Sequence, residues 1–189
     1  MFLLGRPSSQ QIEHFLESSR KLPLSYEPVG LAKEGKSGFR IDEDITAIGS
    51  GDADFHRAKA ALARWAHFEL GWAALFPKRA PIVPGTVVAV LARHAGFWSL
   101  KGCRVVYSLG TEAETEFGFA YGTLSNHAAS GEEIFKIRLH PQTGVVSYVI
   151  RAASKPRAPL AKLGNPIART IQARFRRDSG QALVRSISR

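Results

Sequence analysis

Four side chains suited to acid–base chemistry fall in one stretch of the chain: Tyr121, His127, Glu132 and Glu133. An imidazole beside carboxylates transfers protons when burial moves their pKa values toward the working pH. That chemistry requires the groups to converge within hydrogen-bond reach, and a structural ion pair at a sheet edge explains the same grouping. We therefore predict no catalytic residue, and an enzyme that uses Tyr121, His127 or Glu133 as acid or base stays an alternative.

Glu133 shares one face of a predicted strand with Phe135 and Ile137, so its carboxylate points toward a core or a pocket. A buried carboxylate needs a partner. Arg104 and Arg151 lie on neighbouring predicted strands, and we expect one of them to supply it.

Neither a metal site nor a covalent nucleophile is indicated. His127 with Glu132 and Glu133 offers nitrogen and oxygen ligands, but the HExxH spacing is absent. Cys103 lies in an apolar predicted strand, where a thiol usually serves as packing. The sequence predicts no metal and no cofactor.

Alternating apolar residues predict an edge strand over 39–48 and then five antiparallel strands joined by short connections. These five cover 86–92, 98–109, 117–122, 132–139 and 145–153. In the third of them Gly118, Ala120 and Gly122 leave one side nearly bare, as if a helix or a ligand approaches closely.

Two long helices are predicted. Apolar residues from Phe55 to Phe76 recur at helical spacing and predict one helix over about 53–76, ended by Pro77. Pro166 suits the first position of the other, C-terminal helix.

These elements predict an α+β fold in which a curved antiparallel sheet of about six strands grips the C-terminal helix, with the 53–76 helix packed on it. We expect a single domain over 1–189. It comprises an N-terminal helix and loop (1–38), the sheet with the inserted helix (39–156) and a basic C-terminal helix (157–189).

The composition is that of a globular protein, with 44% hydrophobic and 22% charged residues. No apolar run approaches the roughly 20 residues of a membrane span, and no signal peptide is recognisable. Together with the single cysteine, these features predict a cytoplasmic location.

Positive charge is concentrated at the end of the chain. The whole chain has a net charge of +10. The segment from Arg151 to Arg189 contains ten basic residues and a single acidic residue, Asp178. Such a segment attracts nucleic acid or anionic lipid, although a solvated helix face has the same composition. The candidate contacts for an anionic partner are Lys162, Arg169, Arg174, Arg176 and Arg177.

Four stretches resemble the bacterial and plant family called domain of unknown function 1990. They read RAKAALARWAHFELGWAALFP, AGFWSLKGCRVVYSL, FGFAYGTLSNHAASGEEIFKIRLHPQTGVVSYVIRAASKP and LGNPIARTIQARFRRDSG, and they span about residues 40–187. The family implies no activity and no catalytic residue. The element order is also similar to the helix-grip superfamily of START-like and pollen-allergen-like proteins, which bind apolar molecules between a curved sheet and a C-terminal helix.

We therefore predict a binding module for a small apolar or amphipathic molecule, with nucleic-acid or anionic-membrane contact and enzyme activity as alternatives. Because residues alternate along strands, the candidates cannot all face one cavity. The candidate ligand-binding residues are Trp98, Arg104, Phe119, Tyr121, His127, Glu133 and Arg151.

Overall fold

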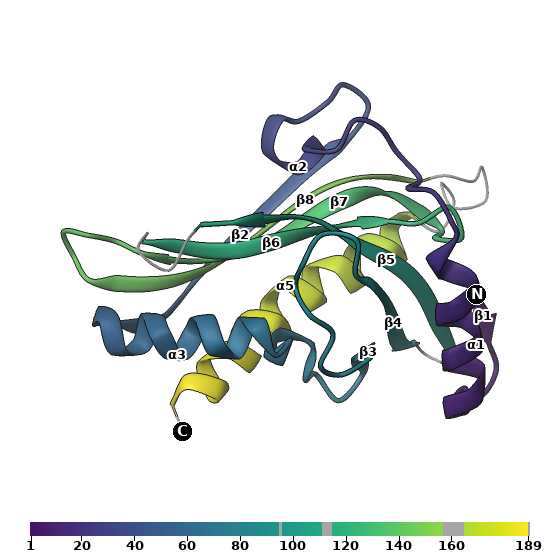
Figure 1. Ribbon diagram of the computed structural model, residues 1–189, viewed down its shortest axis with the longest axis horizontal. Helices are drawn as coiled ribbons and strands as arrows, with labels where there is room; N and C mark the ends of the chain where they lie inside the picture. The colour runs from purple at the N-terminus through teal and green to yellow at the C-terminus, as the bar shows by residue number, and fades with distance from the viewer. Residues whose placement is uncertain (95, 111–114, 157–164, 189) are drawn as a thin grey trace.

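The computed structural model describes residues 1–94, 96–110, 115–156 and 165–188. Its centre is an eight-stranded antiparallel sheet in the order β2-β8-β7-β6-β5-β4-β3, with β1 paired to the start of β5. Figure 1 shows a curled sheet with α3 and α5 against its concave face and α2 on the other side. The strands are β1 (Phe2–Leu3), β2 (Arg40–Ser50), β3 (Ala73–Phe76), β4 (Val87–His94), β5 (Phe97–Leu109), β6 (Glu116–Thr123), β7 (Ala129–Leu139) and β8 (Val145–Pro156). The helices are α1 (Ser9–Arg20), α2 (Leu31–Glu34), α3 (Gly51–Ala63) and α5 (Asn165–Ile187).

The predicted meander is confirmed by β4 through β8, and the predicted edge strand is β2, which pairs with β8. The prediction of about six strands is too low because it omits β1 and β3. The predicted C-terminal helix is confirmed over Asn165–Ile187, and its expected first residues, 157–164, lie outside the described residues. Within the described part of the chain, no helix is both long and apolar enough to cross a membrane.

The predicted helix over 53–76 is confirmed as far as Ala63, but its second half is wrong. Helix α3 ends at Ala63, and Trp65 has a left-handed backbone with a φ of 64°. After a 3₁₀ turn at Ala66–Phe68, the chain becomes β3 and pairs with β4. The free edge of β4 provides hydrogen-bond partners for this segment, so tertiary pairing overrides the helical spacing of its apolar residues.

Each face of the sheet has its own core. On the concave face Phe119, Phe135 and Tyr148 pack with Trp65 and with Leu183 of α5. This helix lies so close to the sheet that a Cβ on its Gly180 would come within 2.6 Å of the Thr46 hydroxyl in β2. A glycine in the helix therefore allows a close approach that any larger residue would prevent.

On the convex face the nearly bare side of β6 meets the N-terminal segment. The ring of Tyr26 lies over Gly122, where an added Cβ would stand 2.3 Å from the Tyr26 hydroxyl. The expected close approach is observed, but it is made by the non-helical segment around Tyr26 and not by a helix or a ligand. Around this contact Leu31, Ala120 and Ile134 form the convex core.

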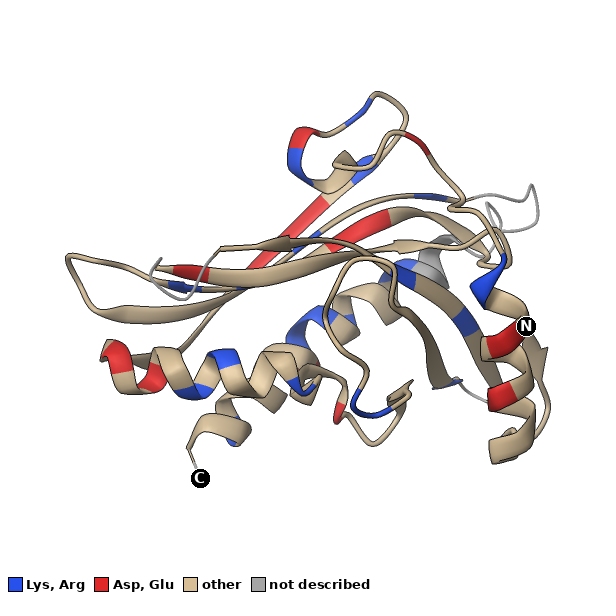
Figure 2. Ribbon diagram, in the orientation of Figure 1, with Lys and Arg blue, Asp and Glu red and all other residues tan. Residues whose placement is uncertain are grey.

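Figure 2 shows basic residues along α5, and ion pairs within the fold partly neutralise their charge. Arg176 pairs with Asp44 of β2, while Arg174 and Arg177 both pair with Asp178. Arg174 also stacks over the ring of Trp72, 4.5 Å from its centroid. Among the other candidate contacts for an anionic partner, Arg169 is exposed and Lys162 lies outside the described residues. The anion-contact hypothesis stays a prediction.

One buried carboxylate makes several of the contacts that hold the N-terminal segment onto the sheet. Glu132 of β7 is 2% exposed and accepts four hydrogen bonds. The hydroxyls of Tyr26 and Tyr107 donate at 2.7 and 2.6 Å, and the backbone amides of Gly30 and Ala32 donate at 3.0 and 3.1 Å. Burial, together with the carboxylate, raises the pKa of both tyrosines, so they stay protonated as donors.

We predict that Glu132→Gln lowers the free energy of unfolding by about 2–4 kcal/mol. The four donors share two carboxylate oxygens, whereas the amide of glutamine has only one acceptor oxygen. Urea unfolding followed by circular dichroism measures this change. Glu17→Gln, at an exposed glutamate on α1, is the matched control, with an expected change below about 0.5 kcal/mol. Equal effects of the two variants would contradict the anchoring role of Glu132.

Candidate functional site

A cavity of about 130 Å³ lies between the concave face of the sheet and α5. Most of its wall is apolar, and a few polar side chains from several strands and from α5 interrupt it. The apolar residues include Phe68, Trp72, Val90, Ala92, Ile171 and Phe175. The polar residues include Lys101, Tyr121, Thr123, His127, Glu133 and Gln172.

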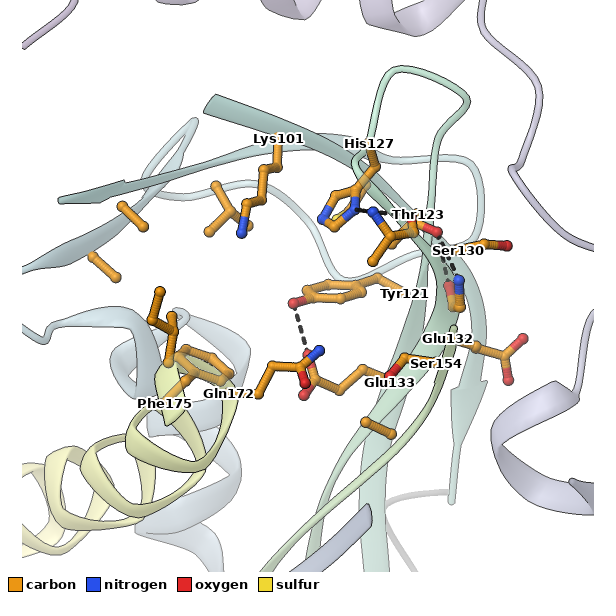
Figure 3. A pocket seen from close by; sticks show the side chains of 18 of the residues that line it. Lys101, Tyr121, Thr123, His127, Ser130, Glu132, Glu133, Ser154, Gln172 and Phe175 are labelled. Atoms are coloured by element: carbon orange, nitrogen blue, oxygen red, sulfur yellow. Dashed lines mark hydrogen bonds between the residues drawn. The ribbon is translucent and has the colours of Figure 1, made fainter. Parts of the chain in front are cut away.

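Strand alternation and register explain how the polar groups meet. Lys101 shares a face of β5 with Cys103 and Val105, and Tyr121 of β6 stands directly opposite Glu133 of β7. Figure 3 shows Lys101, Tyr121 and Glu133 directed into the same space. Three neighbouring strands therefore deliver an amine, a phenol and a carboxyl group to one cavity.

Tyr121 and Glu133 form a hydrogen-bonded pair, with the tyrosine hydroxyl donating to Oε2 of the glutamate at 2.8 Å. Burial raises the pKa of Glu133 to about 7, although Tyr121, Arg176 and Lys101 act in the opposite direction. Burial and the neighbouring glutamate raise the pKa of Tyr121. The pair is therefore a phenol hydrogen-bonded to a carboxyl group that changes charge near neutral pH.

Lys101 contributes the positive charge of the cavity. Burial lowers the pKa of its amine, and the nearby Cys103 and Glu133 oppose that shift. Its Nζ makes no hydrogen bond or ion pair to any residue that the structure describes. Figure 3 shows this amine turned toward the space between Tyr121 and the helix residue Phe175.

His127 and Thr123 border the cavity and also stabilise the turn between β6 and β7. Nδ1 of His127 lies 2.9 Å from both the backbone nitrogen and the backbone oxygen of Ala129. The Thr123 hydroxyl accepts from the amide of Gly131 at 2.9 Å and lies 2.6 Å from the hydroxyl of Ser25. These contacts orient the two side chains and fix the turn between β6 and β7.

The four residues that suggested acid–base chemistry are divided by the sheet. Tyr121, His127 and Glu133 line the cavity, whereas the carboxylate of Glu132 points to the convex face (Figure 3). Adjacent residues in a strand face opposite ways, so the two glutamates cannot act on one molecule.

Among the candidate ligand-binding residues, Tyr121, His127 and Glu133 lie at the cavity, and the other four lie elsewhere. Phe119 is fully buried beneath the cavity, with its ring centroid 4.7 Å from that of Trp65. Trp98 packs with α1, under the guanidinium of Arg6.

The prediction that Arg104 or Arg151 partners Glu133 is wrong. Arg104 donates to the backbone oxygens of Arg20 and Leu22 at 3.0 and 2.9 Å. Arg151 donates to the oxygen of Ala32 and pairs with Glu43. Both arginines alternate onto the convex face, where they fasten the N-terminal segment.

Lys101 and Gln172 are cavity residues that the sequence analysis did not select. A signal for Lys101 was present, since it alternates with the apolar residues Cys103 and Val105 along its strand. No comparable signal marks Gln172, whose place depends on how α5 lies across the sheet. Among the described residues, no group of three or more His, Cys, Asp or Glu side chains could hold a metal ion.

We predict that Glu133→Gln becomes more stable relative to the wild type as the pH rises from 5 to 8. A carboxyl group with a raised pKa stabilises the fold when protonated, and this contribution is lost as the pH rises from its ordinary value of 4.5 through about 7. Urea unfolding at four pH values measures the difference. Glu17→Gln should show no such trend, and a constant difference for Glu133→Gln would contradict the raised pKa.

Comparisons with known proteins identify relatives across kingdoms. A UPF0548 protein of Dictyostelium discoideum is 30% identical over 207 residues, covering 99% of this chain and 96% of its own. A UPF0548 protein of Deinococcus radiodurans is 31% identical over 200 residues, covering 98% of each chain.

Solved structures share the fold at low sequence identity. An aromatase/cyclase from Streptomyces sp. R1128 has a TM-score of 0.55 at 15% identity, covering 80% of this chain and 94% of its own. A norcoclaurine synthase from Thalictrum flavum has a TM-score of 0.50 at 10% identity, covering 82% of this chain and all of its own. The architecture is thus the helix grip that the element order predicted.

The family model described as domain of unknown function, DUF1990, matches residues 25–182. This range contains strands β2 to β8, the Glu132 anchor and most of α5. The match confirms the resemblance found in the sequence, and the chain belongs to the DUF1990 family.

Proposed function

We propose that the protein binds a small apolar or amphipathic molecule in the cavity between the sheet and α5. The observation that carries this proposal is a cavity of about 130 Å³ whose apolar wall is interrupted by a few converging polar groups. An engineered apolar cavity of ~150 Å³ in another protein binds benzene. The bound group is accordingly the size of one aromatic ring or a short alkyl chain.

The fold neighbours support a role with small molecules without indicating which one. One is named an aromatase/cyclase, and another is a norcoclaurine synthase solved in complex with a transition-state analogue. At such low identity the likeness shows the fold alone, so the proposal depends on the cavity itself.

The contact between Tyr121 and Glu133 favours a second function, acid–base catalysis on the bound molecule. A carboxyl group with a pKa of about 7 exchanges protons readily at neutral pH. Once a bound molecule is identified, loss of its turnover in Glu133→Gln, with binding retained, would establish this function.

Binding is tested by native mass spectrometry of the purified protein and by a two-dimensional ¹H–¹⁵N NMR titration with 2-phenylethanol, a neutral one-ring probe. We expect saturable shifts at the cavity residues. Shifts that do not saturate, or that lie away from the cavity, would count against the proposal.

We predict that Ala92→Phe weakens probe binding at least tenfold, because the Ala92 side chain faces the cavity and a phenyl ring would fill it. Such overpacking costs about 1–3 kcal/mol of stability, and circular dichroism verifies that the fold is retained. Ala173→Phe, on an exposed position of α5, is the matched control and should bind as the wild type does. If Ala92→Phe does not fold, Ala152→Val on β8 narrows the cavity by less. Unchanged binding in a folded, narrowed variant would place the probe elsewhere.

A further inference from the structure

The cavity holds a lysine amine that makes no direct contact with an anion among the described residues, although Glu133 acts on it electrostatically from across the cavity. Nζ of Lys101 lines the cavity and lacks a hydrogen bond or ion pair among the residues the structure describes. A charge removed from water is costly unless it is paired. Glu132, which is 2% exposed, accepts from four donors, whereas the half-buried Lys101 has no such contact within the described part of the chain. The contrast indicates that a partner for Lys101 arrives from outside.

Within the fold, Glu133 is the candidate partner for the Lys101 amine, but its carboxyl group does not pair with it. No ion pair joins it to Lys101, and its Oε2 accepts from the Tyr121 hydroxyl instead. Both groups line the same cavity, so there is space between the amine and this pair for part of a bound molecule.

We propose that the cavity selects a small organic acid, whose carboxylate binds Nζ of Lys101 while its apolar part lies against Phe68, Val90 and Phe175. This inference rests on the proposed binding function and specifies the chemistry of the ligand. An ammonium–carboxylate contact is a charge-assisted hydrogen bond, which is stronger than one between neutral groups. The cavity volume of about 130 Å³ limits the apolar part to one ring or a short chain.

The charge on Glu133 then affects binding, because a second carboxylate in the cavity repels the first. The groups that face Glu133 are Tyr121 of β6, Lys101 and Cys103 of β5, Arg176 of α5 and Tyr148 of β8, and His127 borders the same cavity. Since burial holds the pKa of Glu133 near 7, its side chain is neutral at pH 6 and charged at pH 8. A simple carboxylic acid, with a pKa of about 4–5, is ionised at both values. Affinity for the acid therefore falls as the pH rises.

The test compares phenylacetate with 2-phenylethanol, two probes of similar shape that differ in charge, by NMR titration at pH 6. We expect the wild type to bind phenylacetate at least tenfold more tightly. Lys101→Met should lose this preference while still binding the alcohol, and Lys101→Arg should retain it. Lys21→Met, at an exposed lysine, is the matched control and should behave as the wild type does.

Each outcome of this comparison decides between the two proposals. Equal affinity of the wild type for both probes overturns the carboxylate proposal and leaves the binding function standing. Absence of binding for both probes overturns both. If Lys101→Met does not fold, Lys101→Gln replaces it. A Lys101→Gln variant that still prefers phenylacetate as strongly as the wild type does would overturn the role of the amine.

A second arm repeats the phenylacetate titration between pH 6 and 8. We expect the wild-type affinity to fall several-fold and Glu133→Gln to remove most of this dependence. His127→Gln should keep it, which separates the titration of the histidine from that of the glutamate. An unchanged pH dependence in Glu133→Gln would overturn the part assigned to Glu133.

Discussion

The alternation of side chains along β7 is the constraint on which the rest of the structure depends. It sends two adjacent carboxylates to opposite faces of one sheet. On the convex face Glu132 is saturated by four donors and anchors the N-terminal segment. On the concave face Glu133 meets only part of its hydrogen-bonding capacity through Tyr121 and borders a cavity. One side of the strand thus anchors the N-terminal segment, and the other presents a titratable carboxyl group to the cavity.

The cavity exists because the sheet curls while α5 covers only part of its concave face. Large side chains such as Phe119, Phe135 and Tyr148 fill one part of that face and contact Leu183 of the helix. Toward the other part the wall is built from smaller residues, including Ala92 and Ala152. A charged amine and a titrating carboxyl group in such a place raise the free energy of the fold, and proteins tolerate that cost chiefly at functional sites.

Much of the candidate site was within reach of the sequence. The alternation of Glu133 with Phe135 and Ile137 predicted that its carboxylate faces inward, and the structure agrees. The predicted partner of that carboxylate was wrong. Arg104 and Arg151 were chosen because they lie on neighbouring strands, without regard to the face of the sheet on which they lie. Applied to β5, the same alternation places Lys101 inside and Arg104 outside. The alternation can be read from each strand alone, but assigning its residues to the cavity requires knowing which face of the sheet α5 covers.

By itself, the sequence determined the meander, the C-terminal helix and the family, because turn residues and apolar periodicity act over short distances along the chain. Only the tertiary structure decided that the residues from Ala73 to Phe76 form a strand, since the free edge of β4 outweighs their helical spacing. It also decided which polar groups share the cavity. Lys101, Tyr121, Glu133 and Gln172 come from three strands and a helix, and their convergence depends on strand register and on the path of α5 across the sheet. Those are properties of packing between distant segments, which no local pattern encodes.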